Sequence, residues 1–164
     1  TARRLEAIAG ITCDVCALFG SPMRAARIFV SDGRVVEWAG VVQVRDGVVI
    51  DRDRETAVPH LKYDFETVPA GATFAFTIEA ENLSEKERAL LGAAIFEWQE
   101  GFTIGGGSSR GLGRAKLTRI TARGIDFSNS EERRAYLLER KVPERNWEET
   151  FQKAIDEVLQ KMNE

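Results

Sequence analysis

The chain has 164 residues, of which 43% are hydrophobic and 30% charged, and it carries a net charge of −3. This size suits a single domain whose core needs no disulfide staples. The negative charge excludes a uniformly basic nucleic-acid binder, and no apolar run approaches the ~20 residues of a membrane span. With no visible secretory signal, we expect a cytoplasmic protein without a membrane partner.

The first predicted element is a helix over residues 2–9, which ends at Gly10. Because the chain opens on Thr1 inside this helix, we expect a further segment to precede it. A turn over residues 18–22 then leads to a short buried strand over residues 28–30.

Residues 35–50 are rich in β-branched side chains, and Asp46-Gly47 predicts a hairpin turn within them. Residues 51–56 are charged at nearly every position, which predicts an exposed arm. A short strand is expected over residues 63–66. A further strand over residues 73–79 has alternating apolar positions that predict one buried face, namely Phe74, Phe76 and Ile78.

The helix over residues 84–99 has the sharpest signal in the chain. Ser84 and Glu87 form a capping box, and the apolar positions that follow lie on one stripe. Strands are expected over residues 102–104 and 115–121, on either side of a glycine-rich loop.

Two helices are predicted in the tail, over residues 130–140 and 147–162, and the second is amphipathic. The chain therefore alternates helices and strands without an internal repeat. This order predicts an α+β fold with an antiparallel sheet.

Cys13 and Cys16 form a C-x-x-C pair, which could be redox-active, half of a zinc site, or two buried small residues. A structural zinc needs four ligands, and His60 is the only other good candidate. Structural packing is therefore favoured and no metal is expected, while zinc completed by ligands outside these residues stays open.

Positive charge is concentrated in one segment. Between Gly101 and Gly124 there are five basic residues and no acid, whereas six acids stand against two cations between Glu79 and Glu100. Such a distribution favours a polyanion on one face. A solvated surface cluster formed by chance is the alternative.

The loop over residues 105–114 holds five of the 14 glycines. Glycine permits successive backbone N–H groups to line a phosphate-binding concavity, and serine hydroxyls and arginine forks add donors. The candidate binding residues here are Gly105, Gly106, Gly107, Ser108, Ser109, Arg110, Gly111, Gly113 and Arg114, followed by Lys116. A tight connection with solvated arginines is the other reading.

Two nucleotide motifs are excluded in this loop. It contains no Gly-Lys pair, as the G-x-x-x-x-G-K-[ST] motif requires, and the G-x-G-x-x-G spacing ends on Arg110 or on Lys116. The loop is also expected to join strand to strand, so no helix dipole lies behind it. We therefore expect no nucleotide cofactor.

No catalytic residue can be named. His60 lies beside Pro59 in the charged arm, where we expect exposure, and no Ser-His-Asp or Cys-His arrangement can be placed. The acids of residues 51–55 alternate with Arg52 and Arg54, which indicates charge balance rather than metal binding.

Three segments occur in a recognisable order: Leu18-Phe19-Gly20-Ser21-Pro22; Gly47 to Arg52 leading to Tyr63-Asp64-Phe65-Glu66; and Gly105 to Arg114. Over about residues 1–121 the chain resembles the RAMP superfamily, in particular the backbone subunits of type III CRISPR-Cas effector complexes.

The resemblance implies a ferredoxin-like (RRM-like) core over residues 1–125 with an inserted thumb hairpin at about residues 45–63, followed by a helical extension over 126–164. It implies binding of CRISPR guide RNA and target RNA, head-to-tail self-association, and other effector subunits as partners. The glycine-rich loop would contact the guide backbone, and further contacts would come from Arg24, Arg27, Arg52 and Arg54.

The front of the chain departs from the family pattern. Members begin with a strand and a loop, which in target-cleaving subunits carries a catalytic aspartate, and neither is present in these 164 residues. We therefore expect a sheet without its first strand and a non-catalytic RNA scaffold. An endoribonuclease that processes guide precursor or cuts target RNA, with its catalytic loop outside this chain, is the alternative. A small-ligand or protein-interaction domain is a third reading.

Overall fold

The structure is a computed structural model that describes residues 7, 10, 12–38 and 40–163. The helix predicted over residues 2–9 lies outside these residues, apart from Ala7. The chain divides into two compact units, Ile28–Glu79 and Thr1–Arg27 together with Ala80–Glu164. The boundary expected near residue 125 stays a prediction.

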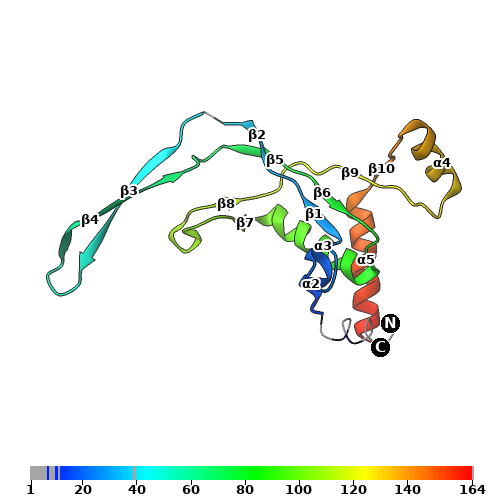
Figure 1. Ribbon diagram of the computed structural model, residues 1–164, viewed down its shortest axis with the longest axis horizontal. Coiled ribbons are helices and arrows are strands. Elements are labelled where there is room, and N and C mark those ends of the chain that lie inside the picture. The colour runs from blue at the N-terminus through cyan, green and yellow to red at the C-terminus, as the bar shows by residue number, and fades with distance from the viewer. Residues whose placement is uncertain (1–6, 8–9, 11, 39, 164) are drawn as a thin grey trace. The chain divides into compact units, whose positions relative to one another are not determined.

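The unit Ile28–Glu79 is built from strand pairs (Figure 1). Its pairs are β1 with β6, β2 with β5, and β3 with β4, the last two antiparallel. Their bounds are β1 (Ile28–Val30), β2 (Arg34–Glu37), β3 (Gln43–Asp51), β4 (Thr56–Thr67), β5 (Thr73–Ala75) and β6 (Ile78–Ala80). The exposed arm expected over residues 51–56 is the end of the long hairpin β3–β4.

The hairpin turn predicted at Asp46-Gly47 is wrong, because both residues lie inside β3. Gly47 pairs with Tyr63, and a Cβ at Gly47 would come 2.3 Å from the Tyr63 ring, so the glycine makes room for an aromatic side chain on the partner strand. The chain reverses instead at residues 52–55. There Asp51 Oδ1 accepts hydrogen bonds from the backbone N–H groups of Asp53 and Arg54, at 3.0 and 3.3 Å.

Two further strand predictions need correction. Residues 73–79 form two short strands, β5 and β6, instead of one. Phe74 and Phe76 are 45% and 38% exposed, so the predicted buried face is not buried. In β1 only Ile28 is buried, while Phe29 and Val30 are half exposed.

The other unit is mainly helical. Its elements are α2 (Asp14–Phe19), α3 (Glu85–Glu100), β7 (Phe102–Thr103), a 3-10 turn η1 (Ser108–Arg110), β8 (Arg114–Ala115), β9 (Ala122–Arg123), α4 (Ser130–Glu139), β10 (Glu144–Arg145) and α5 (Trp147–Met162). β7 pairs with β8 and β9 with β10, both antiparallel. The predicted α+β class is confirmed as a mixed fold with small antiparallel sheets.

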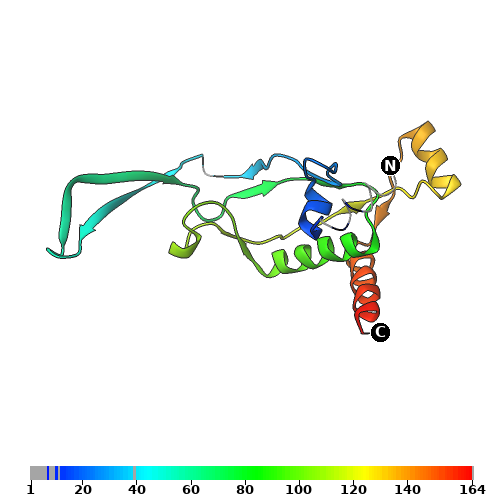
Figure 2. The ribbon, with the colours of Figure 1, turned by 60° about the horizontal axis from the view of Figure 1, so that its bottom comes forward.

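The core of this unit lies between α3 and α5, which cross in both ribbon views (Figure 2). The predicted capping box of α3 is confirmed, and Leu91 and Ile95 are buried as the stripe predicts. Ala154 of α5 is 4% exposed. The two predicted tail helices are confirmed as α4 and α5.

The strand predicted over residues 115–121 is much shorter, because β8 pairs only with the two residues of β7. Beyond Ala115 the backbone leaves the ladder, and Leu117 N–H donates to the carbonyl oxygen of Trp98 at 2.9 Å. None of the helices in the part of the chain that the structure describes has the length and hydrophobicity of a membrane-spanning segment.

Candidate functional site

The glycine-rich loop closes the antiparallel pair β7–β8, so the predicted strand-to-strand setting is confirmed. Ile104 N–H donates to the carbonyl oxygen of Gly113 at 2.9 Å and continues the ladder by one bond. In both ribbon views the loop curls at the end of these strands (Figures 1 and 2).

Glycine is required in this loop by its backbone geometry. Gly107 and Gly113 have φ angles of 73° and 75°, in the left-handed region that other residues rarely adopt. A Cβ at Gly113 would lie 1.9 Å from the carbonyl oxygen of Ile104, which no side chain could tolerate. At Gly107 the space is filled by Leu112, whose side chain is the least exposed of the loop.

The first half of the loop offers unused hydrogen-bond donors. The backbone N–H groups and the serine hydroxyls of residues 105–109 donate to no protein acceptor among the residues that the structure describes, and all five residues are exposed. The second half instead bonds internally, with Arg110 N–H donating to Gly107 O at 2.8 Å. A run of free, exposed N–H groups is what an anion needs from a backbone.

The cations beside this run are unpaired as far as the described residues go. Arg110, Arg114 and Lys116 are exposed, and none takes part in an ion pair within the described part of the chain. Three positive charges and a series of backbone donors therefore lie within twelve residues, which suits a phosphate.

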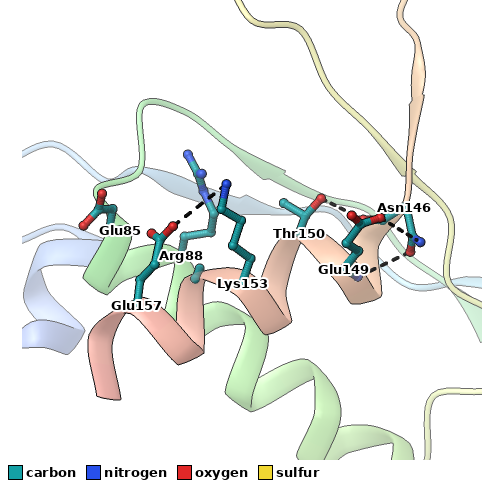
Figure 3. A pocket seen from close by; sticks show the side chains of 8 residues that line it. Glu85, Arg88, Asn146, Glu149, Thr150, Lys153 and Glu157 are labelled. Atoms are coloured by element: carbon teal, nitrogen blue, oxygen red, sulfur yellow. Dashed lines mark hydrogen bonds and ion pairs between the residues drawn. The ribbon is translucent and has the colours of Figure 1, made fainter. Parts of the chain in front are cut away.

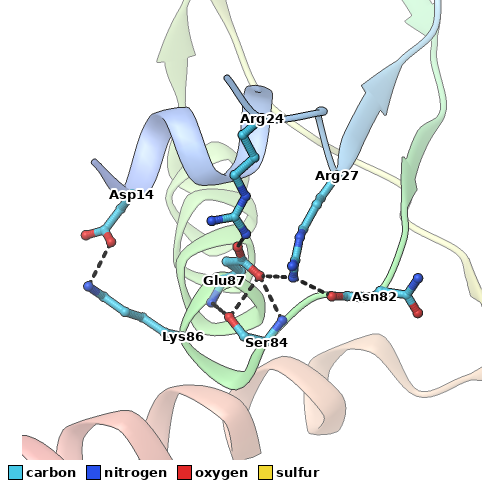
Figure 4. A network of polar contacts seen from close by, with 7 residues as sticks. All are labelled: Asp14, Arg24, Arg27, Asn82, Ser84, Lys86 and Glu87. Atoms are coloured by element: carbon cyan, nitrogen blue, oxygen red, sulfur yellow. Dashed lines mark hydrogen bonds and ion pairs between the residues drawn. The ribbon is translucent and has the colours of Figure 1, made fainter. Parts of the chain in front are cut away.

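Arg24 and Arg27 are brought together at the start of α3 (Figure 4). Arg24 Nη2 donates to Oε1 of Glu87 at 3.0 Å, and Arg27 Nη1 donates to Oε2 of the same carboxylate at 2.8 Å. Arg27 Nη1 also donates to the carbonyl oxygen of Asn82 at 2.6 Å. One acid thus holds two of the predicted RNA-contacting arginines.

Glu87 is the centre of this network. Its side chain is 8% exposed, and it also accepts the N–H and O–H of Ser84, each at 2.8 Å. Burial raises the pKa of Glu87, whereas the hydrogen bonds from Ser84 and the charges of Arg27 and Arg24 lower it. The lowering effects together outweigh burial, so the pKa lies below its ordinary value. Sequence reasoning found Glu87 as a capping residue and missed it as the partner of the arginines.

Arg52 and Arg54 lie in the exposed turn at the end of the hairpin β3–β4. Neither arginine forms an ion pair with another residue that the structure describes, so the charge balance expected with the neighbouring acids is not seen as direct contacts. His60 is exposed in β4, as expected.

The C-x-x-C pair begins α2. Cys13 precedes the helix as its N-cap and is exposed, so the expected packing in a core does not apply to it. Cys16 N–H contacts Cys13 Sγ at 3.4 Å, and this backbone interaction lowers the pKa of the Cys13 thiol. Among the described residues, no group of three or more His, Cys, Asp or Glu side chains is placed to hold a metal.

A cavity of about 540 Å³ lies between α3 and α5 (Figure 3). Arg88 and Lys153 line it together with three glutamates, Glu85, Glu149 and Glu157. Its charged groups sum to −1, and Lys153 lies 4.0 Å from Glu157. The cavity is therefore poorly suited to a polyanion, in contrast to the loop.

The family comparison covers the loop, the hairpin and the arginine pair alike. The model of the RAMP superfamily matches residues 2–116, which is more than half of the chain. The chain belongs to the RAMP superfamily. RAMP proteins are associated with RNA-binding subunits of CRISPR-Cas effector complexes. The comparison with curated proteins finds none that matches. In this RAMP protein, α4 and α5 follow the matched region.

Proposed function

We propose that this RAMP protein binds CRISPR guide RNA as a backbone subunit of a type III effector complex. The observation that carries the proposal is the loop, where five consecutive residues present N–H groups beside cations, and neither the N–H groups nor the cations have a partner among the described residues. Such a site recognises phosphate, which repeats along RNA and carries no sequence information. A guide subunit needs this property, because the guide differs from one complex to another.

The proposed mechanism is electrostatic and geometric. Backbone N–H groups of residues 105–109 would donate to phosphate oxygens, and Arg110 and Arg114 would supply bidentate forks. Lys116 would add charge at the next exposed position. Because each neutralised phosphate releases counterions, binding should weaken steeply as salt rises.

The wider architecture is part of the same proposal. We take the core to be ferredoxin-like and the hairpin β3–β4 to be the thumb, with Arg52 and Arg54 at its tip contacting the guide–target duplex. Head-to-tail self-association and contact with other effector subunits in the cytoplasm would place successive copies along one guide. No residue described here is assigned a catalytic role.

The test compares the double variant Arg110→Ala with Arg114→Ala against the intact protein. We expect its affinity for single-stranded RNA to fall at least about tenfold, because one lost charge-assisted hydrogen bond accounts for roughly that factor. The slope of log K against log salt should fall by about 1.4, at ~0.7 per phosphate contact on a single strand. Fluorescence anisotropy over a salt series measures both.

The control variant removes two positive charges elsewhere, by Arg134→Ala with Lys153→Ala on α4 and α5. Its affinity and slope should stay close to those of the intact protein. Equal losses in the two double variants would show that net charge alone attracts RNA, and unchanged binding in the loop variant would overturn the assignment of the site. The same mixtures on a denaturing gel would reveal cleavage, which would favour the endoribonuclease reading.

A further inference from the structure

Glu87 sits between two arginines and neutralises only one of them. The cluster formed by Arg24, Arg27 and Glu87 therefore keeps a charge of about +1. The three residues come from distant parts of the chain, since 63 and 60 positions separate Glu87 from the two arginines. The carboxylate thereby fixes the two guanidinium groups relative to each other and to the first turn of α3 (Figure 4).

Both guanidinium groups keep N–H donors that the bonds to Glu87 and Asn82 do not use. The arginine side chains are 29% and 34% exposed, against 8% for Glu87. Arg24 uses one nitrogen, Nη2, and Arg27 uses Nη1 alone for its two bonds. The remaining N–H groups have no acceptor among the described residues. A buried acid thus holds one side of each planar group while the other donors stay available.

We propose that Glu87 is a positioning residue for RNA, which pre-orients Arg24 and Arg27 so that their free N–H groups can hold one phosphate segment. Arginine is suited to this, because a rigid planar fork can bond a carboxylate on one edge and an anion on another. Pre-orientation removes rotamer freedom before the RNA arrives, so less entropy is lost on binding. The proposal rests on the function proposed above, because it requires the arginine pair to contact RNA.

The proposal predicts that RNA binding weakens when the negative charge of Glu87 is removed. Removing a negative charge from a surface that binds a polyanion should tighten binding if charge alone mattered. If Glu87 orients the arginines, removing its charge should weaken binding although the net positive charge has risen. The two explanations therefore predict opposite shifts for the same substitution.

Glu87→Gln is the first variant, because glutamine keeps the size of the side chain and can still serve the capping box. Glu85→Gln is its matched control, since Glu85 lies in the same first turn of α3, is exposed, and pairs with Lys161 of α5. Glu87→Asp is the second variant. It keeps the charge but shortens the side chain by one methylene, so the carboxylate can no longer reach both arginines in the same geometry.

We expect Glu87→Gln and Glu87→Asp each to bind single-stranded RNA roughly tenfold more weakly, which is the loss of about one charge-assisted hydrogen bond. Glu85→Gln should bind as tightly as the intact protein or more tightly. Circular dichroism and thermal melting of each variant establish that it is folded, and the aspartate variant decides if the glutamine variant does not fold. Tighter or unchanged binding of a folded Glu87 variant would overturn the proposal.

Two further variants separate this proposal from the general function. If Arg110→Ala with Arg114→Ala loses binding while folded Glu87 variants keep it, the RNA function stands and the positioning role is wrong. If the loop variant and Arg24→Ala with Arg27→Ala both keep full affinity, the proposed function itself fails, and the positioning role fails with it. A loss in Arg24→Ala with Arg27→Ala together with a loss in Glu87→Asp supports the positioning role.

Discussion

Gly92 of α3 lies against Phe151 of α5, and substitution of Gly92 by alanine should change stability in opposite directions in the intact protein and in a Phe151→Gly variant. A Cβ at Gly92 would lie 2.6 Å from Cβ and 2.9 Å from Cγ of Phe151. Because the nearest atom belongs to the base of the side chain, a new rotamer of Phe151 cannot relieve the clash. The helices would have to move apart.

The magnitude follows from two opposing effects. Replacing a glycine in a helix interior by alanine ordinarily stabilises a protein by about 1 kcal/mol, whereas overpacking a buried site costs about 1–3 kcal/mol. We therefore expect Gly92→Ala to lower the free energy of unfolding by up to about 2 kcal/mol. In a Phe151→Gly background Cβ and the ring are both absent, so the clash is removed, and Gly92→Ala should raise the free energy of unfolding by up to about 1 kcal/mol.

The double-mutant cycle consists of the intact protein, the two single variants and the double variant. Urea unfolding followed by circular dichroism gives the free energy of unfolding of each. The coupling energy between the two sites is the difference between the effects of Gly92→Ala in the two backgrounds. Phe151→Gly alone is destabilising, because it removes an apolar side chain from the helix contact and places a glycine inside α5. If Gly92→Ala stabilises the intact protein as much as it stabilises the Phe151→Gly variant, the close contact of α3 and α5 is refuted.

Two other predictions concern the arginine network and the loop. Because the pKa of Glu87 is lowered in the folded chain, its ionised carboxylate stabilises the protein above the unfolded value of ~4.3, and this contribution is lost as the pH falls through the folded pKa. Urea unfolding from pH 7 to 3 should show a steeper loss for the intact protein than for Glu87→Gln, and parallel curves would contradict this. Gly113→Ala should weaken RNA binding in the anisotropy assay while leaving helical circular dichroism unchanged, because its Cβ would meet Ile104 O at 1.9 Å; full affinity would show that the loop geometry is dispensable.

Local signals in the sequence predicted the helices well. The capping box of Ser84 and Glu87 placed the start of α3 within one residue, and the apolar period placed α5. Asn129 and Asn146 cap α4 and α5 through their side-chain oxygens, as N-cap preferences lead one to expect. These features depend on neighbours a few residues apart, so they can be predicted without tertiary structure.

The hairpin shows where local signals mislead. Asp-Gly is a strong turn signal, yet Gly47 is needed where the Tyr63 ring crosses its strand. That requirement comes from a residue sixteen positions away on the partner strand. The actual turn depends on hydrogen bonds to Asp51 that an alternating charged sequence does not single out.

The sequence predicted Arg24 and Arg27 as binding residues but did not predict that Glu87 holds them together. Nothing in the linear sequence connects Glu87 with Arg24 and Arg27, because their contact depends on how the segment before β1 lies against α3. A capping glutamate also needs no arginine to explain it. The signal that could have found it is an alignment of many sequences in which the three positions change together.

The net charge of −3 does not oppose an RNA site, because two of the acids that precede the basic segment form ion pairs within the fold. Glu85 pairs with Lys161, and Glu87 pairs with both arginines. Arg110, Arg114 and Lys116 form no ion pair with any residue that the structure describes, and at physiological salt charges more than ~8 Å apart are largely screened. An approaching phosphate responds to this local field rather than to the charge of the whole chain. Adding a single acid to the loop, as in Ser109→Glu, should consequently weaken RNA binding more than adding one at exposed Gln152 of α5, and equal effects in the anisotropy assay would show that total charge governs binding.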